Sequence, residues 1–220
     1  MSGLQDVNRP DLTPEARVEI FRRWRWEATN DLRQRGVVQA LTIWPEWVWA
    51  IMFLDKDREY RGWHPPKDLI GKRLAIHAGA YIGGRKGMKA RSEGLEAVTR
   101  MARRAGWTVD ATGGPEKVAL TFSKGDKSAV MVPDEILTGA IVATALISDV
   151  TDDTATGEPW KADTYGWKLG ELEVLSTPIP CLGMQGLWFV ANAGEREDIE
   201  AAMRLCERTL IASVAGKDSQ

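Results

Sequence analysis

Charged residues recur at strand spacing in the stretch DKDREYRGWHPP, residues 55–66. If this stretch forms a strand, Glu59, Arg61 and Trp63 lie on one face, because side chains alternate along a strand. An inward Glu59 would pair with Arg61, since neither charge is tolerated alone in a low dielectric. Lys56 would then lie at the mouth of a polar pocket, where its amine can meet an anionic or carbonyl oxygen of a ligand. The alternative interpretation is a salt bridge at the rim of an edge strand.

Tryptophan is unusually frequent, with ten residues in the chain. Its side chain supplies both core area and an aromatic face on which a nucleobase can stack. We expect most of these residues to pack in the core. Those near the charged stretch, or in the later segment YGW, are candidates for pocket walls: Trp44, Trp47, Trp63 and Trp167.

Three further residues carry side chains that are capable of polar chemistry. His77 ends an apolar stretch and is interpreted either as a core histidine or as a general base or donor to a base edge. Gln185 lies in a predicted loop and offers an amide to a base edge, whereas Cys181 is expected to be packed rather than nucleophilic. With two cysteines, two histidines and no G-x-G-x-x-G or P-loop pattern, the sequence predicts no metal site and no cofactor.

Charge is distributed unevenly along the chain. The net charge is −2, which argues against a protein that coats nucleic acid non-specifically. Residues 58–104 nevertheless contain twelve Lys or Arg and four Asp or Glu, an excess of eight positive charges. They include Arg85 and Lys86, in a glycine-rich stretch that we predict to be a loop. The asymmetry is compatible with a basic face for phosphates and also with ordinary solvated helix faces.

Hydrophobic spacing and turn residues predict both helices and strands. Helices are expected at about 14–34, 45–55, 91–106 and 195–214, and a turn-rich insertion at about 85–135. Strands are expected at 37–44, 58–63, 73–79, 139–150 and 165–176, with a last strand before residue 190 after a turn at TPIP. This pattern predicts an α+β fold built on one mixed sheet or small barrel.

No run of the sequence approaches the roughly 20 apolar residues of a membrane-spanning helix. The first 26 residues contain no apolar stretch after a basic start, so we predict no secretory signal. The cysteine content also gives no disulfide framework. We therefore expect a reduced, cytoplasmic protein that does not enter membranes.

Four segments together resemble the ASCH domain, a branch of the PUA-like superfamily. The hallmark of that family is G-x-K-x-x-E-x-R, which Lys56, Glu59 and Arg61 match, while Leu54 stands where the family usually has Gly. The resemblance covers about residues 38–190 outside the insertion. The segments are LTIWPEWVWAIMFLDKDREYRGW, RLAIHAG, GAIVATALISDV and YGWKLGELEVLSTPIPCLGMQGLW.

The resemblance implies a PUA-like β-barrel of about six strands in a mixed arrangement, with helices at the barrel ends. On this basis the chain divides into an N-terminal helical extension at 1–36, an ASCH domain at 37–190 that contains the insertion at about 85–135, and a C-terminal helix at 191–220. The resemblance also implies a cleft beside the lysine-bearing loop, thought in this family to bind RNA or a modified nucleobase.

From this resemblance we expect a module that binds RNA, another single-stranded nucleic acid or a modified nucleoside. Characterised relatives include an amidohydrolase that acts on an N-acetylated cytidine and a ribonuclease. The alternative is therefore a metal-independent hydrolase in which Lys56 and Glu59 are catalytic. The lysine of the amidohydrolase works with a Thr and a Glu, but the residue three positions after Lys56 is Glu59 rather than Thr. That particular activity is accordingly less expected.

A third interpretation is an interaction protein. The long N-terminal helix, with Trp24 and Trp26, and the terminal helix would then form a weak homodimer or dock a partner. Our default expectation is a monomer in which the N-terminal helix packs on its own domain.

Overall fold

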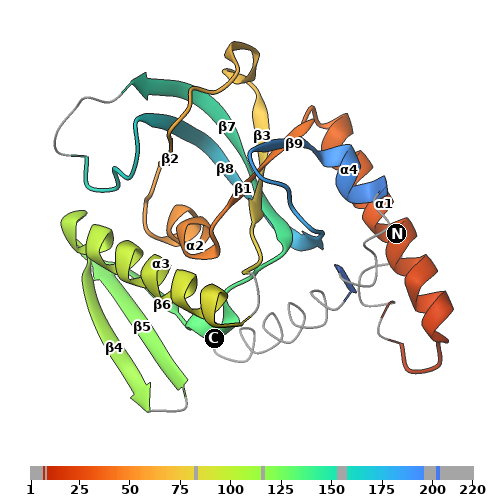
Figure 1. The fold of residues 1–220 in the computed structure, drawn as a ribbon, viewed down its shortest axis with the longest axis horizontal. Helices are drawn as coiled ribbons and strands as arrows, with labels where there is room; N and C mark the ends of the chain where they lie inside the picture. Colours follow the sequence, from red (N-terminus) through yellow and green to blue (C-terminus); the bar gives the residue numbers. More distant parts are fainter. Residues whose placement is uncertain are drawn as a thin grey trace.

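The computed structural model describes residues 7, 9–81, 84–114, 117–152, 158–195 and 202–203. It confirms the α+β class, because helices accompany a six-stranded mixed sheet and a separate three-stranded sheet (Figure 1). The helices are α1 (Pro14–Gln34), α2 (Pro45–Phe53), α3 (Gly84–Arg104) and α4 (Val190–Glu195), with 3-10 helices η2 (Lys67–Leu69) and η3 (Pro133–Glu135). The strands are β1 (Gln39–Ile43), β2 (Arg58–Arg61), β3 (Arg73–Ala78), β4 (Thr108–Gly114), β5 (Lys117–Lys124), β6 (Lys127–Met131), β7 (Ala140–Asp152), β8 (Tyr165–Pro180) and β9 (Leu187–Phe189).

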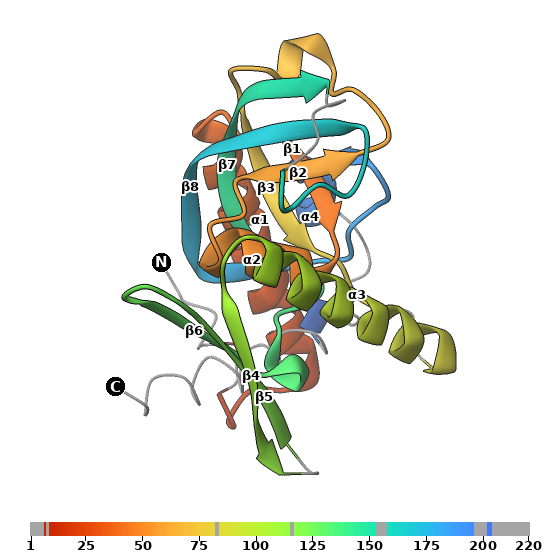
Figure 2. The same ribbon diagram turned by 90° about the vertical axis from the view of Figure 1, so that its left-hand side faces the viewer.

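The six-stranded sheet has the strand order β2-β8-β7-β3-β1-β9. β1 runs parallel to β3, with Ile43 opposite Ala78, and the other neighbours are antiparallel. No pairing among the described residues joins the edge strands β2 and β9, so the sheet is open. β7 and β8 are its longest strands, and they bend together along a ladder that contains three register shifts (Figure 2).

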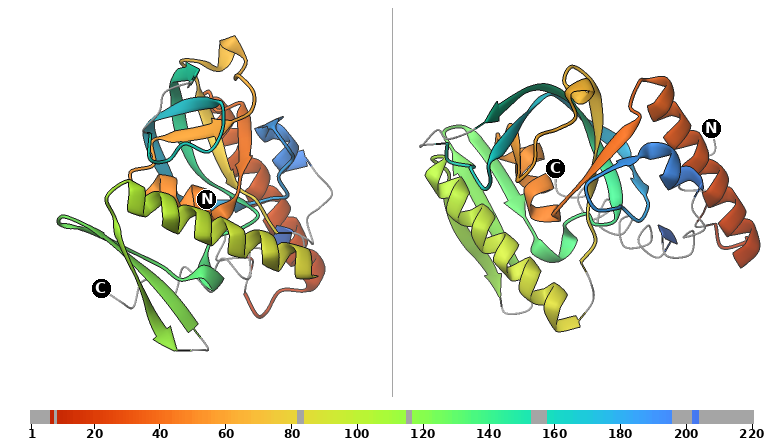
Figure 3. Two further views of the ribbon diagram at one scale, coloured as in Figure 1. Left: turned by 60° about the vertical axis from the view of Figure 1, so that its left-hand side comes forward. Right: turned by 45° about the horizontal axis from the view of Figure 1, so that its top comes forward.

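α2 packs between two hydrophobic cores. Pro45 occupies its first turn, where a missing N–H costs nothing. Val48 and Ile51 pack against the six-stranded sheet, whereas Trp49 and Ala50 pack with side chains of α3 and the three-stranded sheet. Figure 3 shows α3 running alongside β4, β5 and β6. The loop that follows α2 therefore begins at the junction of the two sheets.

α1 begins and ends as the sequence predicts. The Thr13 hydroxyl accepts a hydrogen bond from Ala16 N at 3.2 Å, and Gly36 adopts a φ of +80° just beyond the last turn. Leu32 is buried with Trp188 and other side chains of the β1–β9 side of the molecule. As expected by default, this helix packs on its own chain.

The glycine-rich segment after β3 is helical, and the loop predicted there is wrong. α3 begins at Gly84 rather than at residue 91, which places Arg85 and Lys86 in its first turn. A glycine inside a helix costs about 1 kcal/mol relative to alanine. Gly87 is buried, however, so tertiary packing outweighs this local preference. Residues 85–135 thus form most of α3 and the whole three-stranded sheet, apart from residues 115–116, which lie outside the described ranges.

β8 continues to Pro180, so the turn predicted at TPIP is also wrong. Pro178 falls where the β7–β8 register shifts, and Pro180 lies opposite Ala140. β2 pairs with β8 only over residues 165–168, which leaves the far edge of β8 unpaired beyond that point. A proline, which has no N–H to donate, is tolerated on such an edge.

The end of the chain is described only in part. Of the helix predicted at 195–214, the described residues are Glu195, which ends α4, and Ala202 and Met203, which are also helical; the remainder lies outside the described residues. Within the described ranges, no helix is both long enough and apolar enough to cross a membrane.

Candidate functional site

The turn between α2 and β2 positions the residues of the charged stretch. Leu54 caps α2, with its N–H bonded to Ala50 O at 2.9 Å and an ordinary negative φ of −116°. Asp55 is the residue with a left-handed conformation, at φ +56°. Aspartate tolerates this region better than most residues. Leu54 therefore causes no backbone strain at the position where the ASCH pattern has glycine.

Ion pairs tie this turn to both sheets. Asp55 binds Lys127 of β6 at 2.8 Å, and Asp57 binds Lys168 of β8. The backbone N–H of Leu169 donates to Asp57 O at 2.8 Å. Exposed pairs of this kind each contribute little to stability, about 0–1 kcal/mol. Their effect here is to fix the direction of the short segment that carries Lys56.

The Lys56 side chain is buried, with 2% of its surface exposed. Its Nζ donates to Glu59 Oε2 at 3.1 Å and to the backbone oxygen of Arg58, and it lies 5.6 Å from the centre of the Trp47 ring. We expected this amine at the mouth of a pocket, and that placement is wrong. The nearby carboxylate, carbonyl and aromatic face replace water around the ammonium group, which is why its burial is tolerated.

Glu59 is shared between two cations. Arg61 Nε lies 3.1 Å from Glu59 Oε1 as an ion pair without hydrogen-bond geometry, and Arg61 Nη2 donates to Thr42 O at 2.7 Å. The predicted Glu59–Arg61 pair is therefore confirmed. β2 is also an edge strand, as the alternative interpretation required, yet the carboxylate is only 8% exposed and the Arg61 side chain 23%. We refer to Lys56, Glu59 and Arg61 as the charged cluster.

Burial and the neighbouring carboxylate shift the pKa of Lys56 in opposite directions. Loss of water around the buried amine lowers the pKa of Lys56, and the Glu59 carboxylate raises it in part. Arg61 lowers this pKa further, because two like charges share one carboxylate. The cluster carries a formal charge of +1, and Arg61 is its most exposed member. An anion or carbonyl oxygen arriving from solvent would therefore meet the guanidinium first.

Two of the predicted pocket tryptophans form a pair beside the cluster. Trp167 lies opposite Glu59 in the β2–β8 register and is fully buried. Trp63 meets its ring edge-on at 4.7 Å between centroids, and Trp167 Nε1 donates to Trp63 O at 3.4 Å. Trp167 is therefore a core residue, whereas Trp63 is 37% exposed and Trp47 faces the Lys56 amine.

Trp44 takes part in an arrangement that sequence reasoning missed. Its ring is 52% exposed and stacks on Tyr81, with centroids 5.1 Å apart and an interplanar angle of 26°. The Tyr81 hydroxyl donates to Glu46 Oε2. Trp44 and Tyr81 follow β1 and β3, whose parallel pairing brings both ends to the same edge of the sheet. A prediction that β1 and β3 are parallel neighbours would have placed Trp44 near Tyr81.

Glu46 is the buried partner beneath this aromatic pair. Its side chain is fully buried, Oε1 has no hydrogen-bond partner, and Gly94 of α3 packs so closely that an added Cβ would lie 3.1 Å from Oε2. Burial raises the pKa of Glu46, and burial together with the adjacent carboxylate raises the pKa of Tyr81. Both groups therefore favour their neutral forms more than they would in water.

His77 has the core role rather than an exposed catalytic one. It is 1% exposed, its Nε2 donates to Cys181 O at 3.0 Å, and it meets Trp188 edge-on at 5.6 Å. Burial lowers its pKa to about 4, so the ring is neutral at neutral pH. A Cβ on Gly183 would lie 2.4 Å from the ring, which leaves no room for a side chain there. Cys181 is likewise fully buried, as expected.

Thr42 connects the histidine region to the charged cluster. Its backbone oxygen accepts from Arg61, and its hydroxyl accepts from Trp188 Nε1 at 3.1 Å.

The remaining residues predicted to contact a ligand are all exposed on the surface. Gln185 lies in the loop before β9, and Arg85 and Lys86 lie on α3. Among the described residues, no group of three or more His, Cys, Asp or Glu side chains is arranged to hold a metal ion.

No model of a known protein family matches this chain, and a search among curated proteins finds no match either. The site is therefore defined by its own geometry. That geometry places the Trp47 ring against the charged cluster of Lys56, Glu59 and Arg61. It also connects Arg61 to Trp44 through the short segment that follows Thr42.

Because two cations share the Glu59 carboxylate, replacing Glu59 should destabilise the protein more than replacing Lys56. Glu59→Gln leaves two cations without their common anion, and breaking a buried pair in this way costs about 3–5 kcal/mol. Lys56→Met leaves Glu59 paired with Arg61 and should cost at least about 2 kcal/mol less than Glu59→Gln. Urea unfolding at pH 7 measures both, and Glu171→Gln, in a largely exposed pair with Arg73, is the matched control. Equal losses for Glu59→Gln and Lys56→Met would contradict this account.

The buried histidine makes stability depend on pH. The pKa of His77 is about 4 when folded and about 6.5 when unfolded, so below pH 6.5 the unfolded state binds a proton that the folded state does not. The contribution of the neutral His77 side chain to the free energy of unfolding is complete above pH 6.5 and is lost as the pH falls toward 4. Between pH 7.5 and 5, we expect wild type to lose about 2 kcal/mol more than His77→Gln in urea unfolding. Parallel losses in the two proteins would show that His77 protonates equally easily in both states.

Proposed function

We propose that this chain is an ASCH-type, PUA-like module that binds a nucleobase within single-stranded nucleic acid, RNA above all. Two features support the family assignment. The three residues that match the family's hallmark, Lys56, Glu59 and Arg61, form one contact cluster. The long strands β7 and β8 are bent at register shifts, as strands that form the wall of a barrel must be.

The observation that carries the binding proposal is the Trp44–Tyr81 stack, because its Trp44 ring is half exposed and follows closely on the residue that Arg61 contacts. Arg61 donates to the backbone of Thr42, and Trp44 follows only two residues later. A half-exposed aromatic face thus lies near a partly exposed guanidinium. A base stacked on Trp44 would gain about 1–3 kcal/mol. Arg61 would then meet a phosphate or carbonyl oxygen of the same ligand.

The other members of the site would act through Arg61 and Trp44. Lys56 neutralises Glu59 from the buried side, and Glu59 in turn holds the guanidinium against β1. Glu46 holds the Tyr81 hydroxyl and so keeps that ring beneath Trp44. The exposed cations of α3, including Arg85 and Lys86, supply the phosphate contacts that would extend binding along a strand.

Binding should depend on Trp44 and on salt. Trp44→Ala should weaken binding of a short labelled single-stranded RNA about 5- to 150-fold, the range that corresponds to one stacked base. Trp26→Ala is the matched control, because Trp26 on α1 is equally exposed, and it should leave affinity unchanged. Fluorescence anisotropy at about 50 and 200 mM salt should also show affinity falling steeply with salt for wild type.

Two outcomes of the binding measurement would contradict the proposal. If the protein bound none of the single-stranded RNAs, DNAs and free nucleosides tested, the proposed nucleic-acid function would be excluded. If Trp44→Ala and Trp26→Ala weakened RNA binding equally, Trp44 would not be the stacking site, and the RNA would bind elsewhere on the chain.

A hydrolase is the second candidate, and it requires a substrate that reaches the buried Lys56 amine by displacing its contacts with Glu59 and Arg58. Burial lowers the pKa of Lys56 and so increases the neutral, nucleophilic form. If N-acylated nucleosides or RNA are cleaved, Lys56→Arg should abolish turnover, because arginine keeps the charge but does not deprotonate. Cleavage should persist in a metal chelator. Product analysis by chromatography tests both points, and turnover that survives Lys56→Arg would exclude this mechanism.

A further inference from the structure

Trp63 is a second partly exposed aromatic residue, two positions after Arg61. Glu59 lies opposite Trp167 in the β2–β8 register, so these two side chains project from the same face of the sheet. Arg61 shares that face, because side chains alternate along a strand. The Trp63 ring meets the buried Trp167 ring edge-on, with centroids 4.7 Å apart. The exposed ring of Trp63 and the Arg61 guanidinium therefore lie on the same side of β2.

The chain around Trp63 fixes its position. The Trp63 backbone oxygen accepts a hydrogen bond from Trp167 Nε1 at 3.4 Å. A Cβ on Gly62 would lie 3.3 Å from a carboxylate oxygen of Asp163, so the bend before Trp63 is closely packed. Pro65, which follows shortly after, is buried and has a fixed φ. An aromatic ring held in place in this way loses little conformational entropy when a ligand binds.

The Arg61 guanidinium joins this segment to the one that carries Trp44. Its Nη2 donates to Thr42 O at 2.7 Å. Trp44 follows Thr42 by two residues, just as Trp63 follows Arg61, and two residues of extended chain span at most about 7 Å. Within the described part of the chain, Arg61 Nη1 has no hydrogen-bond partner and is not buried. One guanidinium thus links two segments with exposed tryptophans and keeps donors for a phosphate oxygen.

We propose that this site takes a short single-stranded oligonucleotide rather than a single nucleoside, with one base on Trp44, a second base on Trp63 and a phosphate between them at Arg61. The inference rests on the proposed function and deepens it, because it names the ligand class. A free nucleoside could occupy only one of the two rings and has no phosphate for the guanidinium. The formal charge of +1 on the charged cluster matches one such phosphate.

Competition against a labelled single-stranded RNA tests the length of the ligand. The competitors are adenosine 5′-monophosphate and oligoadenylates of two, four and six nucleotides. We expect the oligoadenylates to compete more strongly for wild type. Trp63→Leu, which keeps apolar cover over Trp167, should weaken the oligoadenylates about 5- to 150-fold, the range for one stacked base, and leave the monophosphate unchanged. Trp63→Phe should retain most of the affinity, because it keeps an aromatic face.

A matched control and a change in the ligand complete the experiment. Trp26→Leu, on the exposed Trp26 of α1, should leave every competitor unchanged. Urea unfolding establishes that each variant is folded. A tetranucleotide with one adenine and three abasic positions needs no protein variant, and it should compete no better than the same backbone stacked on a single ring allows, about 5- to 150-fold worse than the full tetraadenylate.

Two results would overturn the inference. The monophosphate would compete as well as the hexanucleotide, or Trp63→Leu would weaken all competitors equally, as expected if Trp63 only supports the fold. Either result would leave binding that depends on Trp44, and with it the proposed function, in place. If the labelled RNA did not bind at all, both the proposed function and this inference would be rejected.

Discussion

The carboxylate of Glu59 is the charge on which the local structure of the candidate site depends. It lies between Lys56 and Arg61, both within 3.1 Å, and is almost fully buried. Without it, two cations would face each other in a poorly hydrated environment, where their repulsion is much stronger than in water. With it, the edge strand β2, the turn after α2 and, through Arg61, the backbone of β1 are held together.

The three-stranded sheet takes part in the same construction. Lys127 of β6 binds Asp55, the left-handed residue of the turn that carries Lys56. The strands of the three-stranded sheet also complete the core that buries one side of α2. In that core, Trp49 lies against Phe122 with ring centroids 5.2 Å apart. This sheet and α3 are thus integral to the shape of the site, because the turn and α2 both pack against them.

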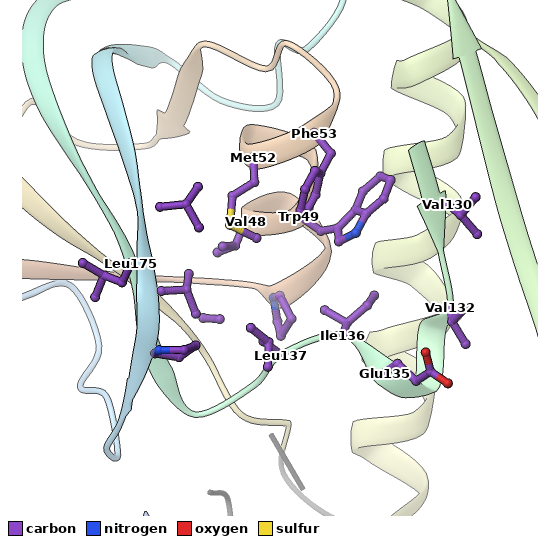
Figure 4. Close-up of a pocket in the computed structure, with 15 residues that line it drawn as sticks. Val48, Trp49, Met52, Phe53, Val130, Val132, Glu135, Ile136, Leu137 and Leu175 are labelled. Atoms are coloured by element: carbon purple, nitrogen blue, oxygen red, sulfur yellow. The ribbon is translucent and has the colours of Figure 1, made fainter. Parts of the chain in front are cut away.

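α2 separates two surfaces that differ in chemistry. The residues that precede it and follow it contribute to the charged cluster and the Trp44–Tyr81 stack. The apolar side chains of Val48, Met52 and Phe53 line an apolar groove between α2 and β8 (Figure 4). A polar or charged ligand suits the first surface, where a guanidinium and an aromatic face are accessible. The second surface is apolar, and covering it would be favourable because few polar groups would lose water.

Local sequence signals were sufficient for most of the elements. Thr13 and Pro14 begin α1, Pro45 begins α2, and the alternation of Glu59 and Arg61 predicted their pairing on β2. These features depend on capping, φ restriction and side-chain period, which neighbouring residues fix by themselves. The same local signals failed at Gly84 and at Pro178, where packing and an unpaired strand edge outweighed propensity.

Tertiary structure alone decided how the site is arranged. The burial of Lys56 depends on a carboxylate, a carbonyl and the Trp47 ring reaching its amine together, which residue spacing does not specify. The contact of Trp44 with Tyr81 depends on the parallel pairing of β1 and β3, which are separated by twenty-nine residues of sequence. The sequence by itself determined which residues carry charge and on which strand. The long-range packing of the sheet determined which of them are buried, because burial depends on residues that are distant along the chain.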